Sequence, residues 1–252
     1  MPILLFYHIS KTAGSTISNL FYKYEIMETP GMISIDIKGN DGERRIESTT
    51  HLNFDDFYNK SLKRELDVKL LYYVEQHGHH VKSFYQDINK LKELKSIHND
   101  NLFIFTILRN PLEHTISLYN YFNNVNVPTC SKEKIADTLR YNYQAHYLYN
   151  CTTFWRDNEN YLNKKDTNKL ISYIDCYIDH VGIVDNLDYT LNIINNKFNT
   201  DLKITKKKNV TKKKTIRLSD LTEKEIEIIK KKTELDNYLY IKYKNKLESI
   251  HK

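Results

Sequence analysis

The chain contains 252 residues, of which 40% are hydrophobic and 28% are charged, so it is long enough for one α/β domain with a sizeable core. No segment approaches the roughly 20 consecutive apolar residues that a membrane-spanning helix needs. This excludes stable membrane insertion of the chain as given and predicts a soluble, cytoplasmic protein. The net charge is +6, and the six lysines within residues 206–214 equal that excess. A local basic patch suits a polyanion, a nucleotide or a membrane surface, and is also common in solvated loops.

The predicted strands and helices alternate along the chain. Apolar runs rich in β-branched and aromatic residues predict strands at residues 3–7, 69–75, 102–108 and 177–184. Helices are predicted at residues 15–25, 88–97, 112–123, 132–149, 160–173, 187–198 and 222–247. This alternation predicts a parallel sheet covered by helices on both faces. Residues 29–50, around the sequence GNDG, indicate a small hairpin insertion, and no linker divides residues 1–252.

The first motif is HISKTAGST at residues 8–16, between the first strand and the first helix. Backbone N–H groups at such a turn are unpaired, and they converge with the positive end of the helix dipole on an anion. Lys11 adds a full charge, and Gly14 allows close backbone approach. The hydroxyls that can cap the helix or reach a ligand belong to Thr12, Ser15 and Thr16. The motif predicts a phosphate site or, equally well, an ordinary capped helix. The GK[ST] ending of a Walker-type loop is absent, which disfavours a nucleoside triphosphatase.

The second motif, FIFTILRNPLEHTISLYNYF, occupies residues 103–122. It places Arg109 at the carboxyl end of a buried strand, where open α/β sheets bind ligands, and the arginine fork matches phosphate. Ser117 lies about two helical turns further on, so it faces the same anion only if the loop at Arg109 folds back. The alternative for this segment alone is that Arg109 pairs with an acid and Ser117 is a surface residue.

The third motif, QHGHHV at residues 76–81, also follows a predicted strand. His77, His79 and His80 fit a general base with an orienting partner, metal ligands, or plain loop residues. Metal binding is the weakest of these interpretations, because no cysteine or well-spaced carboxylate is nearby. Three strand ends that carry a phosphate loop, an arginine and a histidine cluster favour a functional site.

The cysteines add little to these motifs. Cys130, Cys151 and Cys176 are spaced too widely for a zinc motif, and their odd number permits at most one disulfide within the chain. A reducing compartment is the simpler expectation.

With these three motifs in this order, the chain resembles the PAPS-dependent carbohydrate sulfotransferases, most closely the heparan sulfate and uronyl 2-O-sulfotransferase group. HISKTAGST resembles the loop that binds the 5′-phosphosulfate of 3′-phosphoadenosine 5′-phosphosulfate (PAPS). LRNPLEHTISLY resembles the segment that binds its 3′-phosphate, and HGH resembles the catalytic histidine segment. NVTKKK, within residues 203–217, and the helix at 222–247 are similar to the family's loop over the nucleotide and its closing helix. Ser10 and Asn110 depart from the common proline and aspartate but remove no implied ligand.

The resemblance implies a P-loop-like fold and an O-sulfotransferase that moves a sulfonate group from PAPS to a hydroxyl and leaves 3′-phosphoadenosine 5′-phosphate (PAP). His79 is implied as the general base with His77 as its companion, although a one-residue slip gives that role to His80. Lys11 is implied to stabilise the leaving group. The residues implied to bind the donor are Lys11, Thr12, Ala13, Gly14, Ser15, Thr16, Arg109, Ser117, Thr211 and Lys212.

The implied acceptor is the hydroxyl of a polysaccharide or another glycan, with no metal and no nucleic acid. The animal enzymes are anchored Golgi proteins, so the resemblance implies the Golgi lumen if an anchor has been removed and the cytoplasm otherwise. Two other classes stay open. A nucleotide kinase or NTPase shares the parallel sheet and phosphate loop but requires magnesium, and a non-catalytic polyanion-binding module accounts for the lysines without chemistry.

Overall fold

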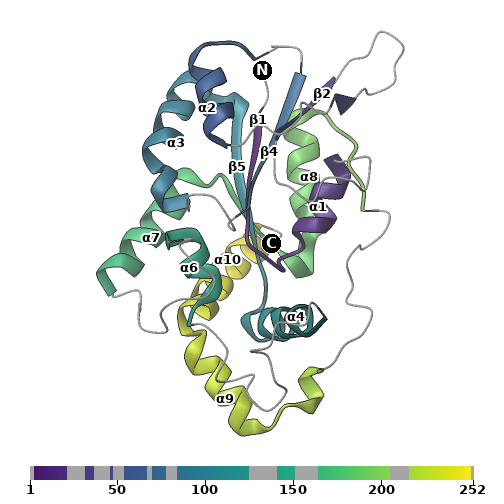
Figure 1. The fold of residues 1–252 in the computed structure, drawn as a ribbon, viewed down its shortest axis with the longest axis vertical. Helices are drawn as coiled ribbons and strands as arrows, with labels where there is room; N and C mark the ends of the chain where they lie inside the picture. The colour runs from purple at the N-terminus through teal and green to yellow at the C-terminus, as the bar shows by residue number, and fades with distance from the viewer. Residues whose placement is uncertain are drawn as a thin grey trace.

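The computed structural model describes residues 3–21, 32–36, 46–47, 54–66, 70–77, 84–124, 141–150, 164–204 and 216–250. Within these residues, a six-stranded sheet has the order β3-β2-β4-β1-β5-β6 (Figure 1). The strands are β1 (Ile3–His8), β2 (Met32–Asp36), β3 (Ile46–Glu47), β4 (Leu70–His77), β5 (Leu102–Leu108) and β6 (His180–Ile183).

The centre of the sheet is parallel, as the sequence predicts. Strands β4, β1, β5 and β6 all run in one direction. Every residue of β1 and of β5 is buried, because a central parallel strand has helices on both of its faces. The α/β class and the parallel sheet are therefore confirmed.

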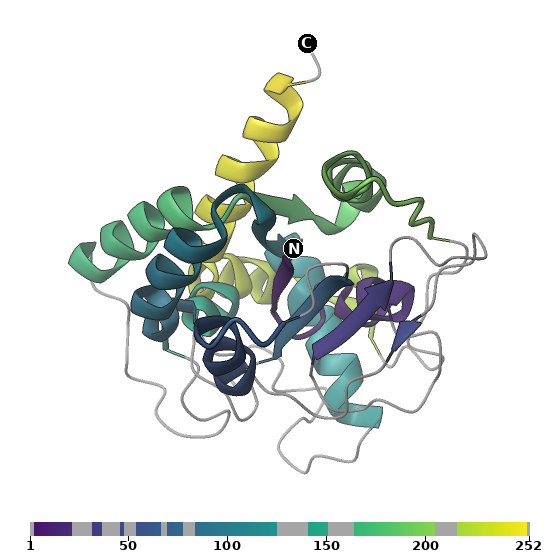
Figure 2. The same ribbon diagram turned by 90° about the horizontal axis from the view of Figure 1, so that it is seen from above.

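Helices cover both faces of the sheet (Figures 1 and 2). One face packs against α1 (Gly14–Phe21) and α8 (Leu187–Phe198). The other face packs against α2 (Phe54–Leu62), α3 (Phe84–His98), α6 (Tyr143–Asn150), α7 (Lys164–Tyr177) and α10 (Glu234–Ile250). Beyond the carboxyl ends of the strands lie α4 (Pro111–Asn124) and α9 (Glu223–Lys232), where α4 joins the 216–229 segment in a third apolar cluster.

The strand order fixes where a ligand crevice belongs. Among the four parallel strands, the chain order leads from β1 outward to β4, back to β5 on the other side of β1, and on to β6. The direction of winding thus reverses between β1 and β5. In open α/β sheets, ligands bind outside the carboxyl ends of the strands at such a reversal, and the segments that follow β1 and β5 are the first two motifs of the sequence.

The predicted hairpin at residues 29–50 is part of the main sheet. β2 pairs with β3 in antiparallel fashion, with Ile35 opposite Ile46. β2 also pairs with β4, with Met32 opposite Val74. The hairpin therefore adds an antiparallel edge to the parallel strands, and its GNDG sequence lies outside the described residues.

Several element boundaries differ from the prediction. The single helix predicted at 222–247 is wrong: α9 and α10 are separate helices divided at Thr233, whose backbone is not helical (φ −114°, ψ 26°). The strand predicted at 177–184 is shorter, because Tyr177 ends α7 and Val184 begins a short 3₁₀ turn. The sequence did not predict α2. No helix of the described segments is long and apolar enough to cross a bilayer.

Candidate functional site

The turn after β1 has an unusual backbone. Lys11 and Ala13 adopt φ angles of 67° and 66°, whereas Thr12 between them is not among the residues with positive φ. Such alternation is the backbone pattern of an anion-binding nest, although here the Thr12 amide donates to the Ile9 carbonyl at 3.3 Å. Within the described part of the chain, neither the Lys11 nor the Ala13 amide donates a hydrogen bond. A left-handed conformation costs a non-glycine residue about 1–2 kcal/mol, and strain of this kind is typical of binding sites.

The rest of the turn is fixed from within. The Thr12 hydroxyl donates to the Ile9 carbonyl at 2.8 Å, and Thr12 is fully buried, so this hydroxyl supports the turn rather than facing a ligand. The Ala13 carbonyl accepts the amides of Thr16 and Ile17 at 2.9 and 3.1 Å, which starts α1. The positive end of the α1 dipole therefore faces the same concave side.

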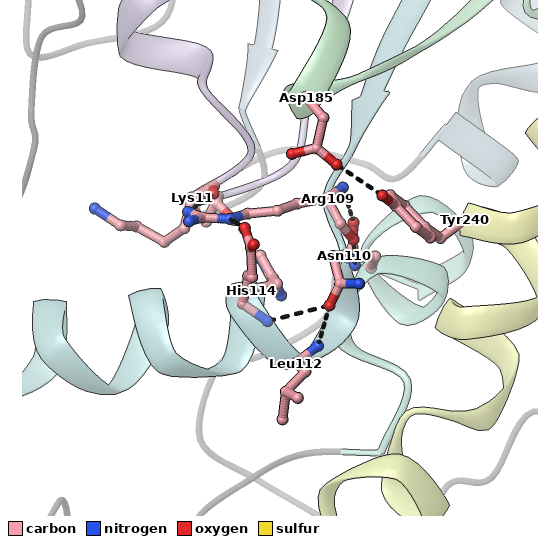
Figure 3. Close-up of polar contacts among 10 residues, drawn as sticks. Lys11, Arg109, Asn110, Leu112, His114, Asp185 and Tyr240 are labelled. Atoms are coloured by element: carbon pink, nitrogen blue, oxygen red, sulfur yellow. Dashed lines mark hydrogen bonds and ion pairs between the residues drawn. The ribbon is translucent and has the colours of Figure 1, made fainter. Parts of the chain in front are cut away.

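Arg109, which follows β5, reaches across to this turn. Its Nη1 donates to the Lys11 carbonyl at 3.3 Å, as Figure 3 shows. Its Nε lies 3.5 Å from Glu113 Oε2, which is an ion pair but too long for a hydrogen bond. This Nε is buried and has no hydrogen-bond partner among the described residues. The first and second motifs are therefore in contact, and the guanidinium retains capacity for a further acceptor.

Lys11 lies beside this guanidinium. Burial, followed by the charge of Arg109, lowers the pKa of Lys11. Its side chain extends away from Arg109 (Figure 3), and its Nζ lies 4.5 Å from the centre of the Tyr121 ring on α4. Two cations in a partly buried position repel one another, so an anion placed between them gains from both.

His114 supports the turn from below, a role that the sequence interpretation missed. It is fully buried on α4, and its Nε2 lies 2.8 Å from the Ser10 carbonyl. A carbonyl accepts only, so Nε2 carries the proton. Burial lowers the pKa of His114 to about 4; the bond to Ser10 opposes this, and the charges of Arg109 and Lys11 add to it. His114 is thus neutral near pH 7. The sequence did contain a signal for this role, because His114 lies five residues after Arg109, on the buried face of the predicted helix.

α4 starts one residue before the predicted helix at 112–123. Pro111 is the first residue of α4, a position where its missing N–H costs nothing. Asn110 Oδ1 accepts the amides of Leu112 and Glu113 at 3.1 and 3.3 Å. Asn110 therefore caps the helix with the same kind of oxygen that an aspartate offers.

The other predicted site residues have less definite places. Ser117 is half-buried on α4, and in the described residues no hydrogen bond joins it to Lys11 or Arg109. Ser15 is half-buried and Thr16 is buried in the first turn of α1. His77 is the last residue of β4, and its Cα is paired with that of His8 at the end of β1. The third motif therefore begins at the same edge of the sheet.

Other predictions lie outside the described residues. These include the general base His79, its alternative His80, and two residues implied to cover the nucleotide, Thr211 and Lys212. The lysines at 206–208 and 212–214 and the cysteines Cys130 and Cys151 also lie outside. Cys176 is an exposed free thiol. The described ranges contain no group of three or more His, Cys, Asp or Glu residues that could hold a metal ion.

Comparisons with known proteins add no assignment. No protein-family model matches the chain, and a search of curated proteins found no match. The features that point to a function are therefore those of the chain itself: two strand ends in contact, a backbone nest, and two adjacent cations at the reversal of the strand order.

Proposed function

We propose that the edge between β1 and β5 binds the phosphates of a nucleotide and that the chain is a PAPS-dependent O-sulfotransferase with a P-loop-like fold. The observation that carries the proposal is the contact between the Arg109 guanidinium and the Lys11 carbonyl. It joins two motifs 98 residues apart into one cationic site. Positive φ angles at Lys11 and Ala13 support an anion at that site.

Different residues are proposed to bind different parts of the sulfonate donor, PAPS. The nest at Lys11 and Ala13, with Gly14 and Ser15 at the start of α1, is proposed to hold the 5′-phosphosulfate. Arg109, together with Ser117, is proposed to hold the 3′-phosphate as a charged fork. Thr211 and Lys212, in the segment between α8 and α9, are proposed to cover the nucleotide. When bound, PAPS supplies the sulfonate group.

His79 is proposed to take the proton from the acceptor hydroxyl, with His77 beside it. As the proton leaves, the acceptor oxygen forms its bond to sulfur, and the bond between sulfur and the bridging phosphate oxygen breaks. Lys11 stabilises the negative charge that develops on this oxygen. A positioned base of this kind contributes typically about 10²- to 10⁴-fold. The proposed acceptor is a glycan hydroxyl.

The donor site is tested by calorimetry with PAP, compared with ATP and magnesium. We expect PAP to bind and Arg109→Ala to weaken it by about ten- to a hundredfold, because charge-assisted hydrogen bonds contribute about 1.5–3 kcal/mol. Arg64, which is exposed after α2, offers a matched control, and Arg64→Ala should leave the affinity for PAP unchanged.

The chemistry is tested by transfer of labelled sulfate to a panel of glycans. His79→Ala should abolish transfer and change the affinity for PAP by no more than a few-fold. Loss of transfer in His80→Ala alone would move the base by one residue. Binding of ATP with magnesium but not PAP would favour a kinase, and binding of heparin without any nucleotide would favour a polyanion-binding module.

A further inference from the structure

The backbone of Arg109 is held by a side-chain amide from α6. The Arg109 N–H donates to Gln144 Oε1 at 2.9 Å, and Gln144 Nε2 donates to the Arg109 carbonyl at 2.9 Å. The pairing of β5 with β6 ends one residue earlier, at Leu108, so the amide replaces a neighbouring strand at this point. Gln144 is only 1% exposed, so its amide group would be left without these partners inside the protein if the two bonds were broken.

Gln144 is in turn fixed by the start of α10. Asp236, also 1% exposed, accepts the amides of Gln144 and Ala145 at 3.0 and 2.8 Å. These amides lie at the N-terminus of α6, where N–H groups have no partner within the helix. Asn142, directly before α6, accepts the amides of Leu235 and Asp236 at 2.8 and 3.3 Å. The two helices therefore cap one another.

We infer that Gln144 is a positioning residue for the anion site and that Asp236 acts on the site through Gln144. The amide sets the direction in which the Arg109 side chain leaves the strand, and that direction brings its Nη1 to the Lys11 carbonyl. Without the Gln144 amide, the N–H and carbonyl of the half-buried Arg109 lose these partners, and the backbone from which the guanidinium extends is no longer held in place. The inference rests on the proposed function for the identity of the anion, a nucleotide 3′-phosphate.

A second amide of the same geometry provides a control. Asn195, near the end of α8, donates to the Leu202 carbonyl at 3.0 Å and accepts the Leu202 amide at 2.8 Å. α8 follows β6 after the 3₁₀ turn Val184–Asn186 and runs back along the sheet, so Asn195 lies about two helical turns away from the carboxyl edge. Asn195→Leu removes this pair of bonds from a backbone that does not contact the anion site, together with the bond that Asn195 Oδ1 accepts from the Thr200 hydroxyl at 2.7 Å.

The first experiment compares the binding of PAP and of AMP, which lacks the 3′-phosphate, by calorimetry. Gln144→Leu removes both bonds without adding a charge. We expect it to weaken PAP binding about tenfold and AMP binding by less than twofold, because Arg109 serves the 3′-phosphate. Asn195→Leu should leave both affinities unchanged, and thermal melting confirms that each variant is folded.

The second experiment follows the pH dependence of Gln144→Glu. A protonated glutamic acid can accept from the Arg109 amide and donate to its carbonyl, whereas the ionised form can only accept. Burial raises the pKa of such a carboxyl toward neutrality. The ratio of variant to wild-type affinity for PAP should therefore be close to one near pH 5.5 and fall about tenfold by pH 8. If Gln144 had only a structural role, the affinity of the variant for PAP would not return to the wild-type value at low pH.

The outcomes separate this inference from the proposed function. If the wild-type chain binds no PAP, the proposed function fails, and inorganic pyrophosphate then serves as the probe for the same variants. Equal affinity of folded Gln144→Leu and wild type overturns the positioning role, as does a chain that binds neither probe. If Gln144→Leu does not fold, the pH profile of Gln144→Glu decides, and a flat ratio overturns the inference.

Discussion

Gly14 determines how closely the anion loop can pack on the sheet, because its Cα lies against the buried ring of His8. A Cβ added at Gly14 would overlap three atoms of that ring. The ring has little room to move, since it stacks on Phe6 at 5.3 Å between ring centres. The glycine is therefore required by contact with His8 as well as by access for the ligand.

This contact predicts that Gly14→Ala destabilises the protein by about 1–3 kcal/mol, as overpacking of a filled core does. Removing the ring should relieve the overlap, so the same change in a His8→Ala background should cost much less. Urea unfolding of the four proteins of this double-mutant cycle measures the coupling. Equal costs in both backgrounds would show that the two residues do not interact.

The motifs identified Lys11 and Arg109 because charge and strand position are local features of the sequence. They did not identify His114 or Gln144. Gln144 is 35 residues from Arg109, and His114 is 104 residues from Ser10. Their roles depend on helices that dock on the strand ends. The helical pattern places His114 on the buried face of α4, but no local pattern identifies the partner of either residue. For Thr12 the sequence predicted a role that the structure does not support. Its hydroxyl, expected to cap the helix or reach a ligand, donates to the Ile9 carbonyl.

Helix α9 starts with a capping box, in which Thr222 and Glu225 each accept the backbone amide of the other. The Thr222 hydroxyl accepts the Glu225 amide at 3.3 Å, and Glu225 Oε2 accepts the Thr222 amide at 2.7 Å. The Thr222 hydroxyl also donates to Glu225 Oε2 at 2.7 Å, and the bonds from the Thr222 amide and hydroxyl lower the pKa of Glu225. The cap fixes the start of α9 directly after Leu221, a buried member of the third apolar cluster.

Loss of this cap should be measurable. Thr222→Ala is expected to reduce the free energy of unfolding by about 1 kcal/mol, the usual cost of an N-cap threonine. Ser219→Ala, at an exposed position just before the helix, should change it by less than about 0.5 kcal/mol. Chemical denaturation at one pH compares the two variants, and a similar loss in both would contradict a specific role for the cap.

Elements with uniform patterns were predictable, and those that depend on distant contacts were not. The boundaries of β5 and α8 coincide with the prediction, because each is a continuous pattern with a clear start and end. The division at Thr233 was not visible. There the turn is set by contacts of α10 with α6, since Asn142 caps α10 and its amide donates to the Lys232 carbonyl. The apolar pattern continues across the break, so periodicity alone predicts one helix.

For the whole molecule, buried titratable groups make stability depend on pH in opposite senses. Burial lowers the pKa of His114 and of His180 to about 4. Each histidine is charged in the unfolded chain below pH 6.5, so the stability it contributes is lost as the pH falls from 6.5 toward 4. Burial raises the pKa of Asp236 to about 7. The stability from this group is present at low pH and is lost as the pH rises from 3.8 through 7.

Two variants should therefore change the slope of unfolding free energy against pH in opposite directions. Between pH 5 and 6 each group contributes nearly one proton, or about 1 kcal/mol per pH unit. Asp236→Asn removes a group whose contribution to the free energy of unfolding decreases as the pH rises, so the slope should rise by about that amount. His114→Gln removes a group whose contribution to the free energy of unfolding increases as the pH rises, so the slope should fall by a similar amount. The glutamine keeps an N–H donor for the Ser10 carbonyl. Urea titrations at several pH values measure both slopes. An unchanged slope in Asp236→Asn would mean that Asp236 is ionised in the folded protein, held charged by the α6 amides of Gln144 and Ala145.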